Sequence, residues 1–213
     1  AKVFSSHLNT DQTIAKLTVA ERIFKREYHK LVDALGSVAH HLTDQYEMQR
    51  LGHPFYNSRS GGGEGHLEVA KNIYYSNKDL CHMVLSLKPF GCMPSTQSDG
   101  AQSAVVSQYK DMIFLPIETS GEGDVNAHSR VQMALGEAKV RAKNEMKAAL
   151  AGTGYSLEQI QEFVADHPEM QRPMYKFGHQ KGVVGVAPNF VIHAAGRMKA
   201  ERRETVAVEA ATA

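Results

Sequence analysis

The chain has 213 residues, of which 42% are hydrophobic and 22% charged, a balance typical of a globular protein of one domain or one and a half, and not of a disordered chain. Its 24 Lys and Arg against 23 Asp and Glu leave a formal charge of +1, which argues against nucleic acid or an acidic membrane surface as a partner. Two cysteines and no signal-peptide pattern favour a reducing, cytoplasmic location, and no apolar run approaches the roughly 20 residues that span a bilayer.

The segment 1–80 is predicted to be mainly helical. A capping-box pattern at Thr18, followed by apolar residues at helical intervals, predicts a helix over 18–35. A second helix is expected over 40–51. A glycine-rich loop over 57–65 then precedes a third helix with an apolar stripe, and we expect this loop to be a turn region with a possible functional role.

The segment 81–150 is predicted to be an α/β core that holds the candidate site. Residues 81–87 and 112–117 have the apolar composition of buried strands, and a short helix is expected over 98–108. Residues 89–94 are expected to be non-helical, because two prolines bracket a glycine there. Strand, loop, helix and strand within about 35 residues form a βαβ unit, so the sequence predicts an α/β fold with a small parallel sheet.

A long amphipathic helix over 125–150 completes this core, and the segment 151–213 is predicted to be helical again. A capping box at Ser156 marks the start of one helix, and a last helix is expected over 187–203. The tail 205–213 contains mostly small and β-branched residues, so we expect it to be frayed.

Two parallel strands do not form a stable sheet by themselves. A further strand is therefore expected, either within residues 2–5 or 182–186 of this chain or in other polypeptide. The chain begins at Ala1 without methionine, which suggests a fragment or a processed subunit. We therefore expect polypeptide outside these residues to complete the sheet.

Cys92 is the main candidate for chemistry. It lies in the loop after the first strand, where free backbone N–H groups and the following helix N-terminus favour negative charge on sulfur. A thiolate in this position can bind metal or act as a nucleophile, and the alternative is a buried free cysteine that packs as a small apolar side chain. Cys81 begins the same strand at its other end, too far away to share a metal ion, and is expected in the core.

The loop 118–124 after the second strand should lie beside Cys92, because the carboxyl ends of parallel strands meet at one edge of a sheet. Glu118 ends an apolar strand, and partial burial would suit this carboxylate for proton transfer. Ser95 and Thr96 are expected to face the group that Cys92 binds. The eleven histidines show no zinc-binding motif, so we expect most of them at the surface or in structural roles.

Two segments, 87–95 and 115–123, carry a family resemblance. They read Leu-Lys-Pro-Phe-Gly-Cys-Met-Pro-Ser and Leu-Pro-Ile-Glu-Thr-Ser-Gly-Glu-Gly, and Ser-Asp-Gly at 98–100 and Arg130 accompany them. With these residues the chain resembles the C-terminal region of the 2-hydroxyacyl-CoA dehydratase and benzoyl-CoA reductase superfamily. The similarity is best over about 85–145 and includes the long proteins that fuse activase-like and dehydratase-like parts.

This resemblance implies that Cys92 is one ligand to a four-iron four-sulfur cluster shared with cysteines of other polypeptide. It also implies an ATP-hydrolysing activase that delivers low-potential electrons, and a CoA thioester or similar substrate. The chain would then be the C-terminal part or a subunit of an iron-sulfur redox enzyme. The alternatives are a non-catalytic structural or electron-relay subunit of such a complex, and a metal-free α/β binding module in which Cys92 is simply buried.

Overall fold

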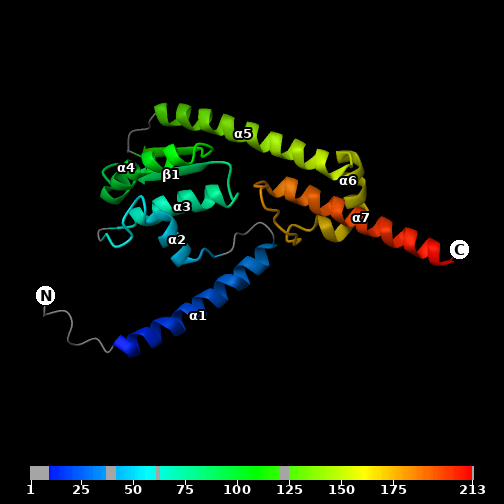
Figure 1. Ribbon diagram of the computed structural model, residues 1–213, viewed down its shortest axis with the longest axis horizontal. Coiled ribbons are helices and arrows are strands. Elements are labelled where there is room, and N and C mark those ends of the chain that lie inside the picture. Colours follow the sequence, from blue (N-terminus) through cyan, green and yellow to red (C-terminus); the bar gives the residue numbers. More distant parts are fainter. Residues whose placement is uncertain (1–9, 37–41, 61–62, 120–124, 213) are drawn as a thin grey trace. The chain divides into compact units, whose positions relative to one another are not determined.

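The computed structural model describes residues 10–36, 42–60, 63–119 and 125–212, and these form a mixed α/β structure (Figure 1). The elements in chain order are α1 (Thr10–Leu35), α2 (Gln45–Gly52), α3 (Gly65–Asn77), β1 (Val84–Pro89), α4 (Met93–Gln108), β2 (Phe114–Thr119), α5 (Val125–Thr153), α6 (Leu157–Ala165), a short 3-10 helix (Pro168–Gln171) and α7 (Val186–Thr212). The described residues divide into two compact units. The smaller contains α1 and Arg172–Lys176, and the larger contains the remaining elements.

The sheet consists of β1 and β2, which pair in parallel and are joined by α4. The register runs from Val84 opposite Phe114 to Pro89 opposite Thr119. The predicted α/β class with a small parallel sheet is therefore confirmed. Of the two segments considered for a third strand, 182–186 forms a turn ahead of α7, and 2–5 lies outside the described residues.

Both strands begin and end about two residues later than predicted. The ladder starts where Val84 N–H donates to the Ile113 carbonyl at 2.8 Å, because a strand exists only where a partner backbone meets it. It ends where Phe90 N–H donates to the Thr119 carbonyl at 2.9 Å. Glu118 therefore belongs to β2 and not to the loop that follows it.

Helix α4 begins five residues earlier than predicted, so the expectation that residues 93 and 94 are non-helical is wrong. Cys92 is the N-cap, and Pro94 occupies the first turn. Proline is tolerated in this position because the N–H that it lacks has no helical acceptor there, and its fixed φ angle suits the helix. Ser95 and Thr96 consequently lie in the first turn of α4.

The predicted helix starts were correct in one case and wrong in another. Helix α1 begins at Thr10, and Thr18 lies inside it with its hydroxyl donating to the Ile14 carbonyl at 2.8 Å, so Thr18 is not a cap. The capping box at Ser156 is confirmed. Gln159 N–H donates to Ser156 Oγ at 3.2 Å, and Ser156 N–H donates to Gln159 Oε1 at 2.9 Å.

Two further helices differ in their limits from the prediction. Helix α2 begins at Gln45, and Asp44 caps it by accepting the Tyr46 N–H at 2.9 Å; residues 37–41 lie outside the described residues. Helix α7 continues to Thr212, so the tail expected to be frayed is helical as far as the structure describes it. The alanines of this tail have high helix propensity, so they favour continuation of α7.

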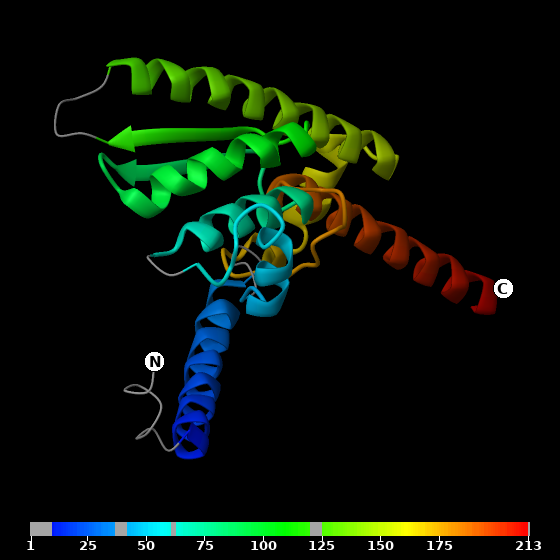
Figure 2. The same ribbon diagram turned by 60° about the vertical axis from the view of Figure 1, so that its left-hand side comes forward.

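The core of the larger unit lies between α3, α4 and one face of the sheet. Its centre is formed by Val69, Ile73, Val105 and Met112, with Phe114 of β2 packed against them. Figure 2 shows α3 and α4 on one side of the strands and α5 along β2 on the other side. Helix α5 also packs along α7. Helix α5 therefore lies next to β2, and β1 is the strand farther from α5.

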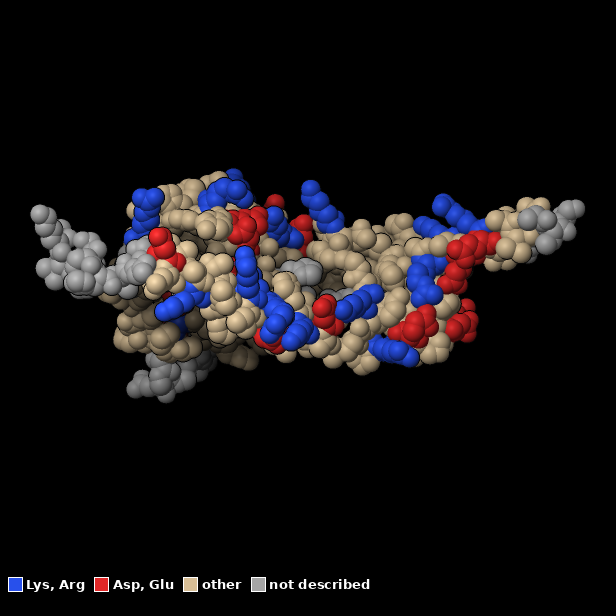
Figure 3. Space-filling model, turned by 90° about the horizontal axis from the view of Figure 1, so that it is seen from below, with Lys and Arg blue, Asp and Glu red and all other residues tan. Residues whose placement is uncertain are grey.

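Charge is mixed over the surface of the protein. On the face shown in Figure 3, Lys and Arg side chains are interspersed with Asp and Glu, as the formal charge of +1 leads one to expect. Among the described residues, no helix combines the length and the apolar character that crossing a membrane requires. The cytoplasmic location inferred from cysteine content stays a prediction.

Candidate functional site

Cys92 lies at the junction of β1 and α4. It is half-buried and caps the 16-residue helix with an extended backbone, and its side chain makes no capping hydrogen bond. Its N–H donates to the Pro89 carbonyl at 3.1 Å, and Gly91 allows this turn with a φ of 75°. The sulfur therefore sits at the positive end of a helix, where negative charge is stabilised, and is not engaged in capping.

The Ser95 hydroxyl connects Cys92 to a carboxylate on α3. Ser95 Oγ lies 3.3 Å from Cys92 Sγ and 2.8 Å from Glu68 Oε1. Ser98 donates to the other oxygen of Glu68, so both carboxylate oxygens accept a serine hydroxyl. Ser95 and Ser98 are 5% and 1% exposed. We name Cys92, Ser95, Ser98 and Glu68 the Cys92 network.

A serine hydroxyl carries one proton, so Ser95 can donate to only one of its two neighbours at a time. While Cys92 is a thiol, Ser95 donates to Glu68 and its oxygen can accept the S–H. Once Cys92 is a thiolate, the same hydroxyl can turn and donate to sulfur. The arrangement therefore offers a proton path from Cys92 to Glu68 and a hydrogen-bond donor for a thiolate.

The two polar residues predicted to face the bound group differ in position. Ser95 is buried and contacts the sulfur of Cys92. Thr96 is exposed, and its hydroxyl donates to the Cys92 backbone carbonyl at 3.0 Å. The geometry therefore supports Ser95 as a neighbour of the bound group and gives Thr96 a local role in the helix.

The glycine-rich segment lies against the same helix start. A side chain at Gly63 would collide with the Pro94 ring, and a Cβ at Gly65 would lie 3.1 Å from the Pro94 carbonyl oxygen. Tyr56 OH donates to Gln97 Oε1 at 2.9 Å. These close approaches hold the beginning of α3 next to the beginning of α4, which places Glu68 within reach of Ser95.

Glu118 is exposed, so the partial burial expected for it is absent from this chain. It lies opposite Lys88 in the sheet, and residues paired across parallel strands point to the same face. The remainder of the predicted loop, 120–124, lies outside the described residues, and proton transfer by Glu118 stays a prediction.

Cys81 lies three residues before β1, at the end opposite Cys92. Burial raises the pKa of the Cys81 thiol, and a backbone hydrogen bond from Met83 offsets part of this increase. A thiol with a raised pKa stays protonated at neutral pH and is a poor metal ligand and nucleophile. Cys81 is half-buried, so it lies at the margin of the core and not inside it as expected.

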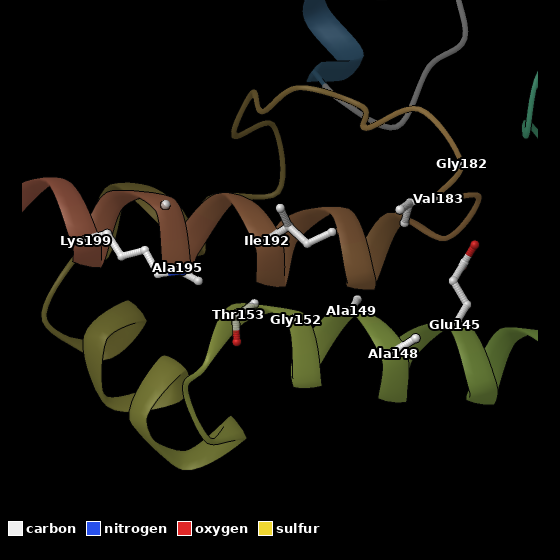
Figure 4. Close-up of a pocket in the computed structure, with 11 residues that line it drawn as sticks. Glu145, Ala148, Ala149, Gly152, Thr153, Gly182, Val183, Ile192, Ala195 and Lys199 are labelled. Carbon is white, nitrogen blue, oxygen red and sulfur yellow. The ribbon is translucent and has the colours of Figure 1, made fainter.

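A cavity of about 560 Å³ lies between α5 and α7 and contains none of the predicted site residues (Figure 4). Its carboxylate, Glu145, accepts the N–H groups of Val184 at 2.6 Å and Gly185 at 2.8 Å and lies 3.1 Å from His82 Nε2. Glu145 therefore holds the turn before α7. The walls include Ala148, Ala149, Gly152, Ala195 and Gly196. A Cβ added at Gly152 or Gly196 would meet no atom within 4 Å, so these small residues leave open space between α5 and α7 and do not mark a close helix contact.

Within the parts of the chain that the structure describes, no group of three or more His, Cys, Asp and Glu side chains is placed to hold a metal ion. Cys92 fits an iron-sulfur cluster as a single ligand, because its sulfur is free and has a hydroxyl donor beside it. Comparisons of the chain with protein-family models, with curated proteins and with solved structures find no match.

Proposed function

We propose that this chain is the C-terminal part or a subunit of an iron-sulfur redox enzyme in which Cys92 is one cluster ligand. The observation that carries the proposal is the free Cys92 sulfur at the N-terminus of α4, with the buried Ser95 hydroxyl 3.3 Å away. Iron-sulfur clusters are held by cysteine thiolates, and hydrogen bonds to their sulfurs tune the reduction potential. One thiolate cannot hold a cluster, so the remaining ligands come from other polypeptide.

The Cys92 network has a defined role in this proposal. A cysteine that binds iron gives up its proton, and the Ser95 hydroxyl would pass the proton of Cys92 to the Glu68 carboxylate. Ser98 keeps Glu68 in place through the second carboxylate oxygen. Ser95 then donates its own hydrogen to the Cys92 sulfur. The bound cluster supplies one-electron transfer at low potential.

The electron source and the substrate follow from the resemblance of the segments around Cys92 and Glu118. An ATP-hydrolysing activase would deliver electrons, and a CoA thioester or similarly hard-to-reduce compound would receive them. Glu118 is the carboxylate of this chain proposed for proton transfer, because it lies at the carboxyl end of β2, on the same sheet edge as Cys92; its exposure in this chain does not supply the partial burial on which this role was predicted.

Iron and sulfide content tests the proposal. The anaerobically purified assembly should contain about four iron and four sulfide ions per cluster and should be brown. The 213-residue chain alone, reconstituted with iron and sulfide, should bind substoichiometric iron that a chelator removes easily. Absence of both elements from the assembly would favour a metal-free binding module. A full, stable cluster on the isolated chain would contradict the requirement for partner ligands.

Removing the Ser95 hydroxyl should change the cluster without removing it. In Ser95→Ala the sulfur of Cys92 loses its hydrogen-bond donor, so the reduction potential of the assembled enzyme is expected to become more negative. Thr96→Ala is the matched control, because its hydroxyl bonds to a backbone carbonyl. Potentiometric titration of both variants measures the effect. Equal shifts in the two variants would show that contact with Sγ is not the cause.

A further inference from the structure

The two edges of the sheet differ in how readily an additional strand can pair with them. In a parallel strand the N–H and C=O of one residue point to the same side, and the side alternates along the chain. Because Val84 and Phe90 donate to β2, Leu85 and Leu87 direct their backbone groups to the opposite, open edge. The described residues place no third strand there. An open edge of this kind is a template for another strand.

The outer edge of β2 is closed by its own sequence. Pro116 lies on that edge and has no N–H to offer a further strand. Its carbonyl accepts a hydrogen bond from Arg130 Nη2 of α5 at 2.9 Å. Proline on an edge and coverage by a neighbouring helix are the usual means of preventing strand addition. On the open edge of β1 the proline, Pro89, comes only at the end of the strand, so an additional strand can still pair with Leu85 and Leu87.

The side chains of β1 are also uncovered. Leu87 is 64% exposed, although its partner across the sheet, Ile117, is 5% exposed under α5. Leu85 is 39% exposed on the same face. Lys88 is the charged residue of this strand, but it is buried in an ion pair with Asp99 and places no charge at the open edge. Strands of parallel sheets are normally buried on both faces, so β1 lacks a second neighbouring strand and a cover over the face that carries Leu85 and Leu87.

We propose that the open edge of β1 binds an extended apolar strand of the partner polypeptide, which runs parallel to β1 and packs its own side chains beside those of Leu85 and Leu87 on the same face of the sheet. This inference rests on the proposed function, because it identifies how the partner reaches the site. A parallel strand ends beside Cys92, so the loop after it can supply a further cluster ligand. A second copy paired antiparallel about Ser86 would place the two Cys92 residues roughly 40 Å apart, too far to share a cluster.

A charged side chain on the open edge tests the proposal in the assembled enzyme. Leu87→Lys is expected to lower the amount of partner polypeptide that co-purifies with the tagged full chain by about tenfold, because a lysine replaces an apolar cross-strand neighbour of the added strand. Val140→Lys is the control, since Val140 is 56% exposed on α5, away from the sheet edge. Circular dichroism of both full-length variants should match that of the unchanged chain.

Photo-crosslinking identifies the occupant. Leu87→p-benzoylphenylalanine in the assembly is expected to crosslink to an apolar, extended segment of the partner that is followed closely by a cysteine. A crosslink to a second copy of this chain or to another segment of the same chain would overturn the proposal. So would partner recovery unchanged in Leu87→Lys, or an assembled complex that gives no crosslink at this position.

The edge proposal and the proposed function can fail separately. If both hold, Cys92→Ser lowers the iron content of the assembly and keeps both the partner and the crosslink at position 87. If the assembly contains no iron and Leu87→Lys loses the partner, strand addition at β1 is supported and iron-sulfur binding is rejected. If the assembly contains iron and Leu87→Lys leaves the partner bound, iron-sulfur binding is supported and strand addition at β1 is rejected.

Discussion

Cys92→Ser is expected to remove most of the cluster iron from the assembled enzyme, whereas Cys81→Ser leaves it nearly unchanged. Serine retains the size of the side chain and is a favoured N-cap residue, so α4 should form as before. The substitution therefore removes a sulfur ligand and little else. Cys81 lies at the opposite end of β1, and its raised pKa keeps it as a thiol.

The anaerobic visible spectrum and the iron and sulfide contents of the two variants provide the measurement. Ser95→Ala serves as a comparison, because it changes the neighbour of the sulfur and leaves the ligand in place. Equal iron loss from Cys81→Ser and Cys92→Ser would show that both thiols bind the cluster. Full iron content in Cys92→Ser would remove the proposed ligand altogether.

The order of elements in the larger unit could be predicted from local pattern, whereas the limits of the elements could not. Two apolar runs separated by a proline- and glycine-rich turn and a polar helix predict a βαβ unit, and the structure has one. The strand limits depend on partner bonds such as that from Val84 N–H to Ile113, which no single run of sequence contains. The start of α4 was missed because Pro94 was read as a helix breaker, although the first turn tolerates proline.

The candidate site was predictable only in its local part. Cys92 and Ser95 are close in sequence, so a turn at the end of a strand brings them together. Glu68 was missed because its contact with Ser95 spans 27 residues and depends on the packing of α3 against α4. A signal was present in α4, where Ser95, Ser98 and Gln102 have the spacing of one helix face, and all three are buried. Buried polar residues on one face indicate polar partners across it.

The predicted partial burial of Glu118 failed for a related reason. An apolar run before a carboxylate indicates a buried strand, but burial at the strand end depends on what packs there: Lys88, the partner of Glu118 across the sheet, is 7% exposed and pairs with Asp99 of α4. In the described chain β1 is the single neighbour of β2, and Glu118 is exposed at the end of the pair.

Asp99→Ala is expected to destabilise the full chain by about 3 kcal/mol, because it leaves the Lys88 charge buried without a partner. Lys88 is 7% exposed, and its ammonium group pairs with Asp99 of α4. The pair joins the end of β1 to α4 on either side of the Cys92 turn. Its loss should therefore loosen the turn as well as lower the free energy of unfolding.

The double variant Lys88→Met with Asp99→Leu tests how much of the loss in unfolding free energy comes from the unpaired Lys88 charge and how much from lost packing. Replacing both members of a buried ion pair by apolar side chains of similar size is often neutral or stabilising, so this variant should regain most of the free energy lost in Asp99→Ala. Urea unfolding followed by circular dichroism measures both. A loss below about 1 kcal/mol in Asp99→Ala would be the value typical of a solvent-exposed pair and would show that the Lys88 ammonium reaches water.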